Sequence, residues 1–242
     1  MKKNLIFIIP AKVSGNLDKK NFIKYKKKYL LEHKINSLLS TKLGPVFVIS
    51  NSKKIIKIST ANNAQGIFVE NSKKLKNGSM LYSITAGLNE IINEGYKIDY
   101  VAVAPIQNLF LKKNSIVKAC KKIISTQKAN SLNAFLQVSE YHPCQIVDQK
   151  NNFMKFDIIK FKNTIFSKTE KTKDLPTANY ASCALRISKF KYLNQLMKKK
   201  RYNKFIVDIK SCLGFEISNK EAFEIKNAKD LKYAKYLYKY VR

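Results

Sequence analysis

An unbroken apolar run near the start of the chain, residues 5–9 (LIFII), constrains the fold more than any other feature. Apolar residues without alternation fit a strand covered on both faces, which is typical of the centre of a parallel sheet. Pro10 ends this run, because proline has no N–H to give to a strand ladder. Open parallel sheets bind ligands beyond the carboxyl ends of their strands, so the polar loop that follows is the first candidate binding segment.

The chemistry of this loop suits a phosphate group. Backbone N–H groups near a glycine, together with lysines, favour bound anions. The loop supplies Lys12, Ser14, Gly15, Asn16, Lys20 and Asn21. It contains neither GxxxxGK[ST] nor GxGxxG, so it is neither a P-loop nor a dinucleotide-binding fingerprint. From these residues alone, a phosphate cradle and a solvated loop in a lysine-rich protein both remain open.

Apolar strands alternate with helical patterns through the first half of the chain. We expect strands at 46–49, 66–69, 100–104 and 131–138, and helices at 29–39, 53–60, 79–92 and 115–125. The expected helix caps are residues 50–52 (SNS), Ser79 and Asn114. Alternation of this kind predicts an α/β fold with a mostly parallel sheet flanked by helices.

The pattern changes after residue 138. Residues 151–173 are polar with short apolar pieces, and we interpret them as a substrate-facing excursion or an antiparallel arm. Strands are then expected at 181–187, 205–209 and 214–217, and helices at 189–199 and 230–240. No repeat or flexible linker is visible, so the expectation is one domain, 1–242, with an embedded arm at about 139–180.

The formal charge of +31 would attract an anionic substrate such as a nucleotide. It is weak evidence for nucleic-acid binding, because only Arg186, Arg201 and Arg242 are arginines and the lysines are spread along the whole chain. Arginine is the preferred fork for phosphates and base edges. The four cysteines form no CxxC pair, so neither zinc nor a redox pair is indicated. No apolar run approaches the roughly 18–20 residues that span a bilayer, and we expect a cytoplasmic protein.

The order of these segments resembles that of the acylneuraminate cytidylyltransferases and the neighbouring 3-deoxy-manno-octulosonate cytidylyltransferases. IIPAKVSGNLDKKNF is similar to the opening strand and PAR…KN loop of that family, and KYLLEHKI to its KPLL…TI helix. VFVISNSKKI, YVAVAPIQNLFLKKNSI and SLNAFLQVSEYHPCQI are similar to later family motifs. KDLPTANYASCALRIS and FEIKNAKDLKYAKYL complete seven matches in family order.

The resemblance implies a Rossmann-like nucleotidyltransferase that transfers CMP from CTP to a sialic-acid-like sugar and releases pyrophosphate. It also implies Mg²⁺ as cofactor, and a homodimer formed through the embedded arm. Carried over by position, Lys12 and Lys20 are the catalytic candidates. The implied nucleotide contacts are Pro10, Ala11, Lys12, Ser14, Asn16, Lys20, Asn21, Ser79 and Pro105. The implied sugar contacts are His142 and Tyr180, and the implied metal ligand is Glu224.

The chain departs from the family pattern at several of these positions. Lys12 replaces an arginine, Ala104 replaces the glutamine that reads the base, and Glu70 replaces another arginine. The two metal-binding aspartates correspond to Glu224 and Lys226, and the ammonium of Lys226 could take the place of the ion. A catalytically degenerate homologue that binds a nucleotide, a sugar or a partner protein is therefore the alternative to an active enzyme.

Overall fold

The computed structural model describes residues 3–13, 21–70, 80–138, 142–145, 148–150, 153–155, 162, 175–201 and 206–240. The chain divides into two compact units, which are described separately below. One unit comprises residues Met1–Ala134 and Ser182–Arg242, and the other comprises Phe135–Ala181.

The larger unit is built on a seven-stranded sheet in the order β11-β7-β10-β6-β1-β4-β5. The strands are β1 (Leu5–Pro10), β4 (Val46–Ser50), β5 (Gln65–Phe68), β6 (Tyr100–Val103), β7 (Ser131–Val138), β10 (Ala178–Lys189) and β11 (Cys212–Glu216). Strand β1 pairs in parallel with both β4 and β6, and β4 pairs in parallel with β5. Strand β10 runs antiparallel to β6. The carboxyl ends of β1, β4 and β6 therefore meet at one edge of the sheet.

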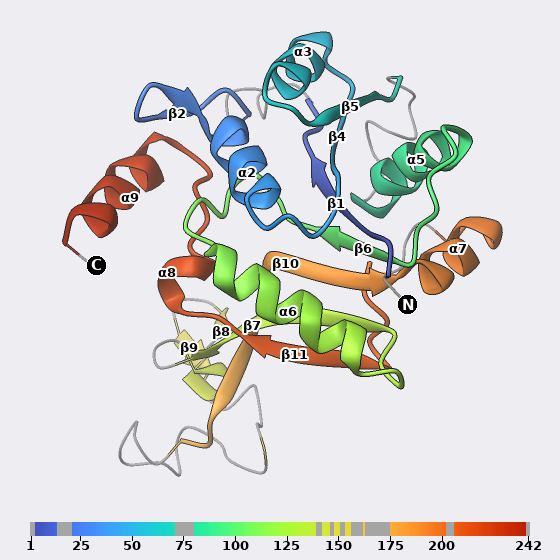
Figure 1. The fold of residues 1–242 in the computed structure, drawn as a ribbon. Coiled ribbons are helices and arrows are strands. Elements are labelled where there is room, and N and C mark those ends of the chain that lie inside the picture. The colour runs from blue at the N-terminus through green and yellow to red at the C-terminus, as the bar shows by residue number, and fades with distance from the viewer. Residues whose placement is uncertain are drawn as a thin grey trace. The chain divides into compact units, whose positions relative to one another are not determined.

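Helices cover both faces of this sheet (Figure 1). They are α2 (Leu30–Leu39), α3 (Lys53–Ala61), α5 (Met80–Asn93), α6 (Lys113–Ser125), α7 (Phe190–Lys198), α8 (Asn219–Ala222) and α9 (Ala228–Tyr240). Buried side chains of α2, α3, α6 and α9 belong to one apolar cluster, and those of α5 and α7 belong to a second. The α/β fold with a mostly parallel sheet flanked by helices is thereby confirmed.

The first strand explains why its sequence does not alternate. Leu5, Phe7 and Ile9 point into the first apolar cluster, while Ile6 and Ile8 point into the second, and each is at most 3% exposed. Since side chains alternate across a strand, both faces of β1 are covered by helices. The uninterrupted apolar run is the sequence signature of that position.

The expected helix caps are met in different ways. The Ser52 hydroxyl accepts a hydrogen bond from the Ile55 N–H and caps α3, as expected. The prediction that Asn114 caps the next helix is wrong, because α6 begins at Lys113 after an N-cap at Lys112 that has no side-chain cap bond. Instead the carboxylate of Glu221 accepts a hydrogen bond from the Lys112 N–H at 3.1 Å. Ser79 lies outside the described residues.

Two segments differ from the expected elements. Residues 206–209 of the expected strand 205–209 are not a strand. The Ser188 hydroxyl donates to the Ile206 carbonyl oxygen at 2.7 Å, and the Ser131 hydroxyl donates to that of Asp208 at 3.2 Å. These bonds fasten the segment through side chains instead of a strand ladder. A short hairpin precedes α2, formed by β2 (Lys24–Tyr25) and β3 (Lys28–Tyr29), and it was not expected.

The described part of the smaller unit contains a second hairpin. Strand β8 (Asp148–Lys150) pairs antiparallel with β9 (Phe153–Lys155), and a short 3₁₀ helix, η2 (Pro143–Gln145), precedes them. Most of the expected arm, 151–173, lies outside the described residues. No helix in the described parts of the chain is long and apolar enough to cross a membrane.

Candidate functional site

The backbone that leaves β1 is held in place by β4 and the residue after it. The Ala11 N–H donates to the Ile49 carbonyl oxygen at 2.9 Å, and the Ser50 hydroxyl donates to the Ala11 carbonyl oxygen at 2.7 Å. The Asn51 amide then bonds Val13 twice, because its Oδ1 accepts from the Val13 N–H and its Nδ2 donates to the Val13 carbonyl oxygen, each at 2.8 Å. The entry to the loop is therefore ordered by protein groups alone.

The far end of the same loop is fastened to its beginning. The Asn21 side chain is 6% exposed, and its Nδ2 donates to the Lys12 carbonyl oxygen at 2.8 Å. Asn21 therefore has a defined structural role at the loop base. Pro10, Ala11 and Lys12 lie at the carboxyl end of β1, where the sequence analysis expects nucleotide contacts. Ser14, Asn16 and Lys20 lie outside the described residues, so their roles stay predictions.

The loop after β6 lies at the same edge and fastens a later part of the chain. Pro105 is buried there, as is Ala104, whose N–H donates to the Ile8 carbonyl oxygen at 3.0 Å. The Gln107 carbonyl oxygen accepts a hydrogen bond from the Ile225 N–H at 3.0 Å. The Asn108 Nδ2 donates to the Ala222 carbonyl oxygen at 2.9 Å. These bonds hold residues 222–226 against the loop, although they follow it by more than 110 positions.

A lysine of the core reaches this loop from behind. Lys34 of α2 is 2% exposed, and its Nζ donates to the carbonyl oxygen of Asn108 at 2.5 Å. Burial lowers the pKa of the Lys34 ammonium from its ordinary 10.5 to about 7. The sequence signal for it was a lysine on the apolar face of the helix, between Leu31 and Leu38. Lys34 links α2, the loop after β6 and, through Asn108, the segment of Glu224.

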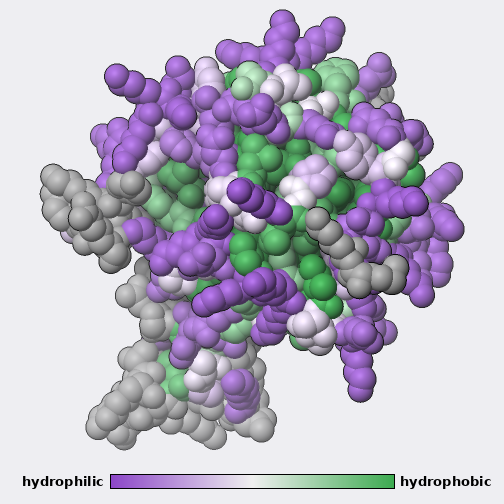
Figure 2. Space-filling model, viewed as in Figure 1, coloured by the Kyte–Doolittle hydropathy of each residue, from purple (hydrophilic) through white to green (hydrophobic). Residues whose placement is uncertain are grey.

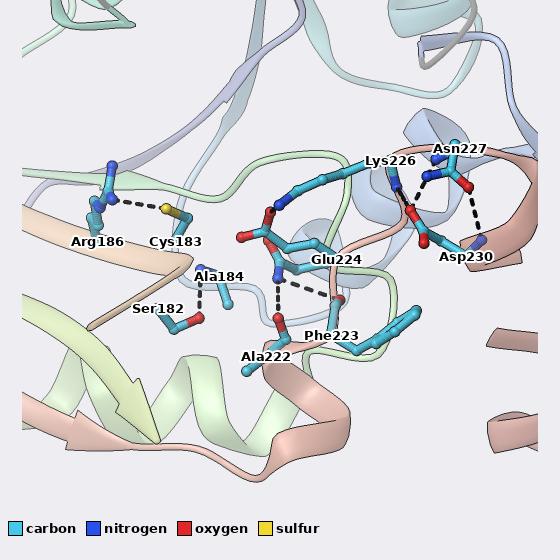
Figure 3. Close-up of polar contacts among 11 residues, drawn as sticks. Ser182, Cys183, Ala184, Arg186, Ala222, Phe223, Glu224, Lys226, Asn227 and Asp230 are labelled. Carbon is cyan, nitrogen blue, oxygen red and sulfur yellow. Dashed lines mark hydrogen bonds and ion pairs between the residues drawn. The ribbon is translucent and has the colours of Figure 1, made fainter. Parts of the chain in front are cut away.

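Glu224 is engaged by a neighbour on its own segment. The Lys226 Nζ lies 2.8 Å from the Glu224 Oε2, and Figure 3 shows the two side chains extending side by side. The Lys226 N–H donates to the Asp230 carboxylate at the start of α9, which orders the backbone at this point. Among the described residues, no three His, Cys, Asp or Glu side chains gather as a metal site. One carboxylate paired with an ammonium does not fit a resident Mg²⁺, which prefers several oxygen ligands.

Sequence reasoning did not single out Arg186 as a site residue. Arg186 lies on β10 opposite Val103, the last residue of β6. Its Nη2 donates to the Cys183 Sγ at 2.9 Å, as Figure 3 shows, and its Nε donates to the Asn133 Oδ1 at 3.2 Å. Cys183 is partly exposed, whereas Cys144 is buried. The available signal was an arginine in a chain where almost every other cation is lysine.

The two expected sugar contacts belong to the smaller unit. His142 is 5% exposed, its Nδ1 accepts a hydrogen bond from the Cys144 N–H, and its Nε2 lies 2.8 Å from the Pro176 carbonyl oxygen. Both ring nitrogens are therefore used within the unit, with the proton on Nε2, an arrangement that holds a turn together. Tyr180 is 65% exposed. A sugar contact stays a prediction for both residues.

The face of the molecule drawn in Figure 2 is hydrophilic at its outline and apolar toward its centre. This distribution agrees with lysines scattered along the whole sequence.

Comparison with solved structures identifies the architecture. A CMP:2-keto-3-deoxy-manno-octonic acid synthetase complexed with CTP superimposes with a TM-score of 0.69 at 10% identity, covering 98% of each chain. A 4-diphosphocytidyl-2C-methyl-D-erythritol synthase from Anaerococcus prevotii superimposes with a TM-score of 0.66 at 13% identity. The match covers 99% of this chain and 100% of that one. A further structure of a synthase with that name superimposes with a TM-score of 0.66 at 13% identity. The match covers 98% of this chain and 99% of that one.

These similarities, at such low identity, establish the fold and nothing finer. The chain has the three-layer α/β fold of these synthetases over nearly its whole length. No protein-family model matches the chain. No curated protein matches its sequence.

Proposed function

We propose that the chain is a nucleotidyltransferase of the cytidylyltransferase type, which transfers CMP from CTP to an acidic, sialic-acid-like sugar. The observation that carries the proposal is the ordered loop entry after β1, beside the loop after β6, in a fold shared with a synthetase complexed with CTP. Loops at the carboxyl ends of adjacent parallel strands are where such sheets bind nucleotides.

In the proposed reaction, the anomeric hydroxyl oxygen of the sugar attacks the α-phosphorus of CTP. The bond from that phosphorus to the bridging oxygen breaks, pyrophosphate leaves, and the hydroxyl proton is lost. Phosphoryl transfer of this kind depends mainly on positioning and on neutralising charge. Lys12 and Lys20 are the cations assigned to the phosphates, and Asn51 and Asn21 hold the backbone that carries Lys12.

The side chains around Glu224 do not fit the expected Mg²⁺ site. Glu224 is paired with Lys226, and no three His, Cys, Asp or Glu side chains of the described residues gather as a metal cluster. No step of the proposed reaction is therefore assigned to a protein-bound Mg²⁺. The same ion pair favours the second candidate function, a homologue that binds a nucleotide or sugar but turns over slowly or not at all.

The test is pyrophosphate release from CTP with a nonulosonic acid, with 3-deoxy-manno-octulosonate and with an uncharged sugar, each with and without Mg²⁺. We expect release with an acidic sugar, and loss of activity in Lys12→Met and Lys20→Ala. Lys57→Met, which changes an exposed lysine of α3, is the matched control. Binding of CTP without release would support the degenerate homologue. Absence of both release and CTP binding would overturn the proposal.

Further parts of the proposal concern the protein's setting. We propose a homodimer formed through the arm at about 139–180 and a location in the cytoplasm. Sedimentation of the whole chain, compared with a variant in which that arm is shortened, tests the dimer. A wild-type chain that sediments as a monomer would contradict it.

A further inference from the structure

Arg186 stands at the edge of the sheet that carries the candidate site. Strand β10 runs antiparallel to β6, and Arg186 lies opposite Val103, where β6 ends. Opposed residues of an antiparallel pair point to the same face. Val103 belongs to the apolar cluster of α5 and α7, so the Arg186 side chain emerges on that face, next to the start of the loop that holds Pro105 and Gln107.

The contacts of Arg186 fix its position and leave its charge without a counter-ion. Its Nε donates to the Asn133 Oδ1, and the Asn133 amide is in turn oriented because its Nδ2 donates to the Ala134 carbonyl oxygen at 2.7 Å. Its Nη2 donates to the Cys183 sulfur. Within the described parts of the chain, Arg186 forms no ion pair with a carboxylate. The ion pair found there joins Lys226 to Glu224.

The Arg186 side chain is partly exposed. Its Nη1 atom donates to no described residue and is not fully buried. Partial burial weakens the hydration of a cation, and an anion restores the lost interaction energy. A guanidinium held through Nε and through one Nη2 N–H keeps its second Nη2 N–H and both Nη1 N–H groups for an incoming oxyanion.

The position favours a carboxylate over the phosphates of the nucleotide. The backbone of Arg186 is two strand spacings, from β10 to β6 and from β6 to β1, from the strand that carries the loop assigned to the phosphates. Two such spacings amount to about 10 Å. Arg186 therefore lies at a different strand from the lysines assigned to the phosphates. The guanidinium is also the side chain suited to the flat, two-oxygen face of a carboxylate, a geometry that lysine does not reproduce.

We propose that the open end of Arg186 binds the carboxylate of the acidic acceptor sugar, an assignment that rests on the proposed function and names its substrate class more closely. Asn133 is then a positioning residue, and Cys183 lies beside the bound anion. The reactivity of the Cys183 thiol can report anion binding at Arg186, since its sulfur is 2.9 Å from the Arg186 Nη2.

Alkylation of the whole chain tests anion binding without any turnover. Iodoacetate carries a carboxylate and iodoacetamide does not, so their rate ratio at Cys183, read by peptide mass spectrometry, reports attraction by Arg186. Cys212 is exposed and is the control within the same molecule. We expect the ratio at Cys183 to exceed that at Cys212 by about tenfold, and to fall to the Cys212 value in Arg186→Met. Equal ratios at both cysteines in the wild type would overturn the proposal.

Kinetics then separate this inference from the proposed function. In Arg186→Lys and Arg186→Met we expect the KM for the acidic sugar to rise about 10- to 100-fold, with the KM for CTP within about twofold of wild type. An unchanged KM for the sugar, or a raised KM for CTP in its place, overturns the carboxylate assignment while the transferase stands. If the wild type releases no pyrophosphate and does not bind CTP, the proposed function fails and the sugar assignment fails with it. The alkylation ratio then still shows whether Arg186 attracts carboxylates.

Discussion

The Nζ of Lys34 donates a 2.5 Å hydrogen bond to the carbonyl oxygen of Asn108, and both residues are buried. One side chain thus connects a helix of the core to the loop after β6. Asn108 continues the connection, because its Nδ2 donates to the Ala222 carbonyl oxygen. A cation in the interior without a described carboxylate partner makes this connection sensitive to pH.

Replacing Lys34 by methionine is expected to remove a pH dependence of stability. Burial lowers the pKa of Lys34 to about 7, whereas an unfolded lysine keeps its proton to about pH 10. Between these values the unfolded chain binds more protons, so the free energy of unfolding rises with pH. Relative to Lys34→Met, the wild type should gain about 2 kcal/mol between pH 7 and 9, measured by urea denaturation. Parallel pH profiles would contradict this, and Lys57→Met is the control.

Glu221→Gln is expected to destabilise the fold in a manner that disappears in acid. Burial alone would raise the pKa of Glu221, but hydrogen bonds from Ser115, Lys112 and Ser218 outweigh it and hold the pKa below its ordinary 4.5. The ionised carboxylate therefore stabilises the fold above that value, and the contribution is lost as the pH falls below it. We expect a loss of about 1–3 kcal/mol at pH 7 by urea denaturation. A difference that persists unchanged at pH 3 would disprove the charge-based explanation, and Glu216→Gln on β11 is the control.

Asn51→Ala is expected to loosen the entry of the candidate phosphate loop. The change deletes both hydrogen bonds to the backbone of Val13, so the free energy of unfolding should fall by about 1–3 kcal/mol. Ser52→Ala, which removes one long helix-cap bond of 3.5 Å, should have a smaller effect. Thermal and urea denaturation measure both variants. Equal effects would show that the Asn51 bonds contribute little.

The turn of the first hairpin offers a stabilising change. Lys26 and Lys27 have φ angles of 47° and 68°, a left-handed conformation that lysine adopts only at an energetic cost. Lys26→Asn combined with Lys27→Gly supplies the residues that such two-residue turns favour. We expect the free energy of unfolding to rise by about 1–2 kcal/mol. Lys28→Gly, one residue later in β3, should lower it, and a loss of stability in the double variant would refute this account.

Lys226→Asp is expected to strengthen divalent-cation binding at the segment of Glu224. The change removes the ammonium from Glu224 and places a second carboxylate on the same ordered segment. Manganese binding followed by electron paramagnetic resonance should be at least about tenfold tighter in this variant than in wild type. Lys226→Met controls for loss of the ammonium alone. Wild-type binding as tight as that of the variant would show that Glu224 holds a metal despite Lys226.

Local sequence patterns were sufficient to predict most of the strands and helices of the fold. The run at residues 5–9 predicted a strand covered on both faces, and Leu5 to Ile9 occupy that position. The terminal helix and the strand–helix alternation follow from periodicity in the same way. The unexpected hairpin carried no Asn-Gly signal, because lysines occupy its left-handed positions. The apolar residues of 205–209 imitate a strand, but polar anchors from distant serines determine their actual conformation.

The site was only partly accessible from sequence, because its important bonds join distant positions. Asn51 and Val13 are 38 positions apart, and Glu221 and Lys112 are 109 apart. No local pattern can pair them. Lys34 and Arg186 were detectable in principle, the first as a charge on an apolar helix face and the second as an arginine among lysines. Their partners, Asn108 and Cys183, emerge only from the folded chain.

The bond from Asn21 to Lys12 has a consequence for how this protein can change. The bond closes the loop at its base, so the separation of its two ends is set by protein groups outside the loop. Extending a closed loop of about nine residues by one residue alters the entropy of closure by about 0.1 kcal/mol. Closure of the base therefore places little constraint on how many residues lie between Lys12 and Asn21.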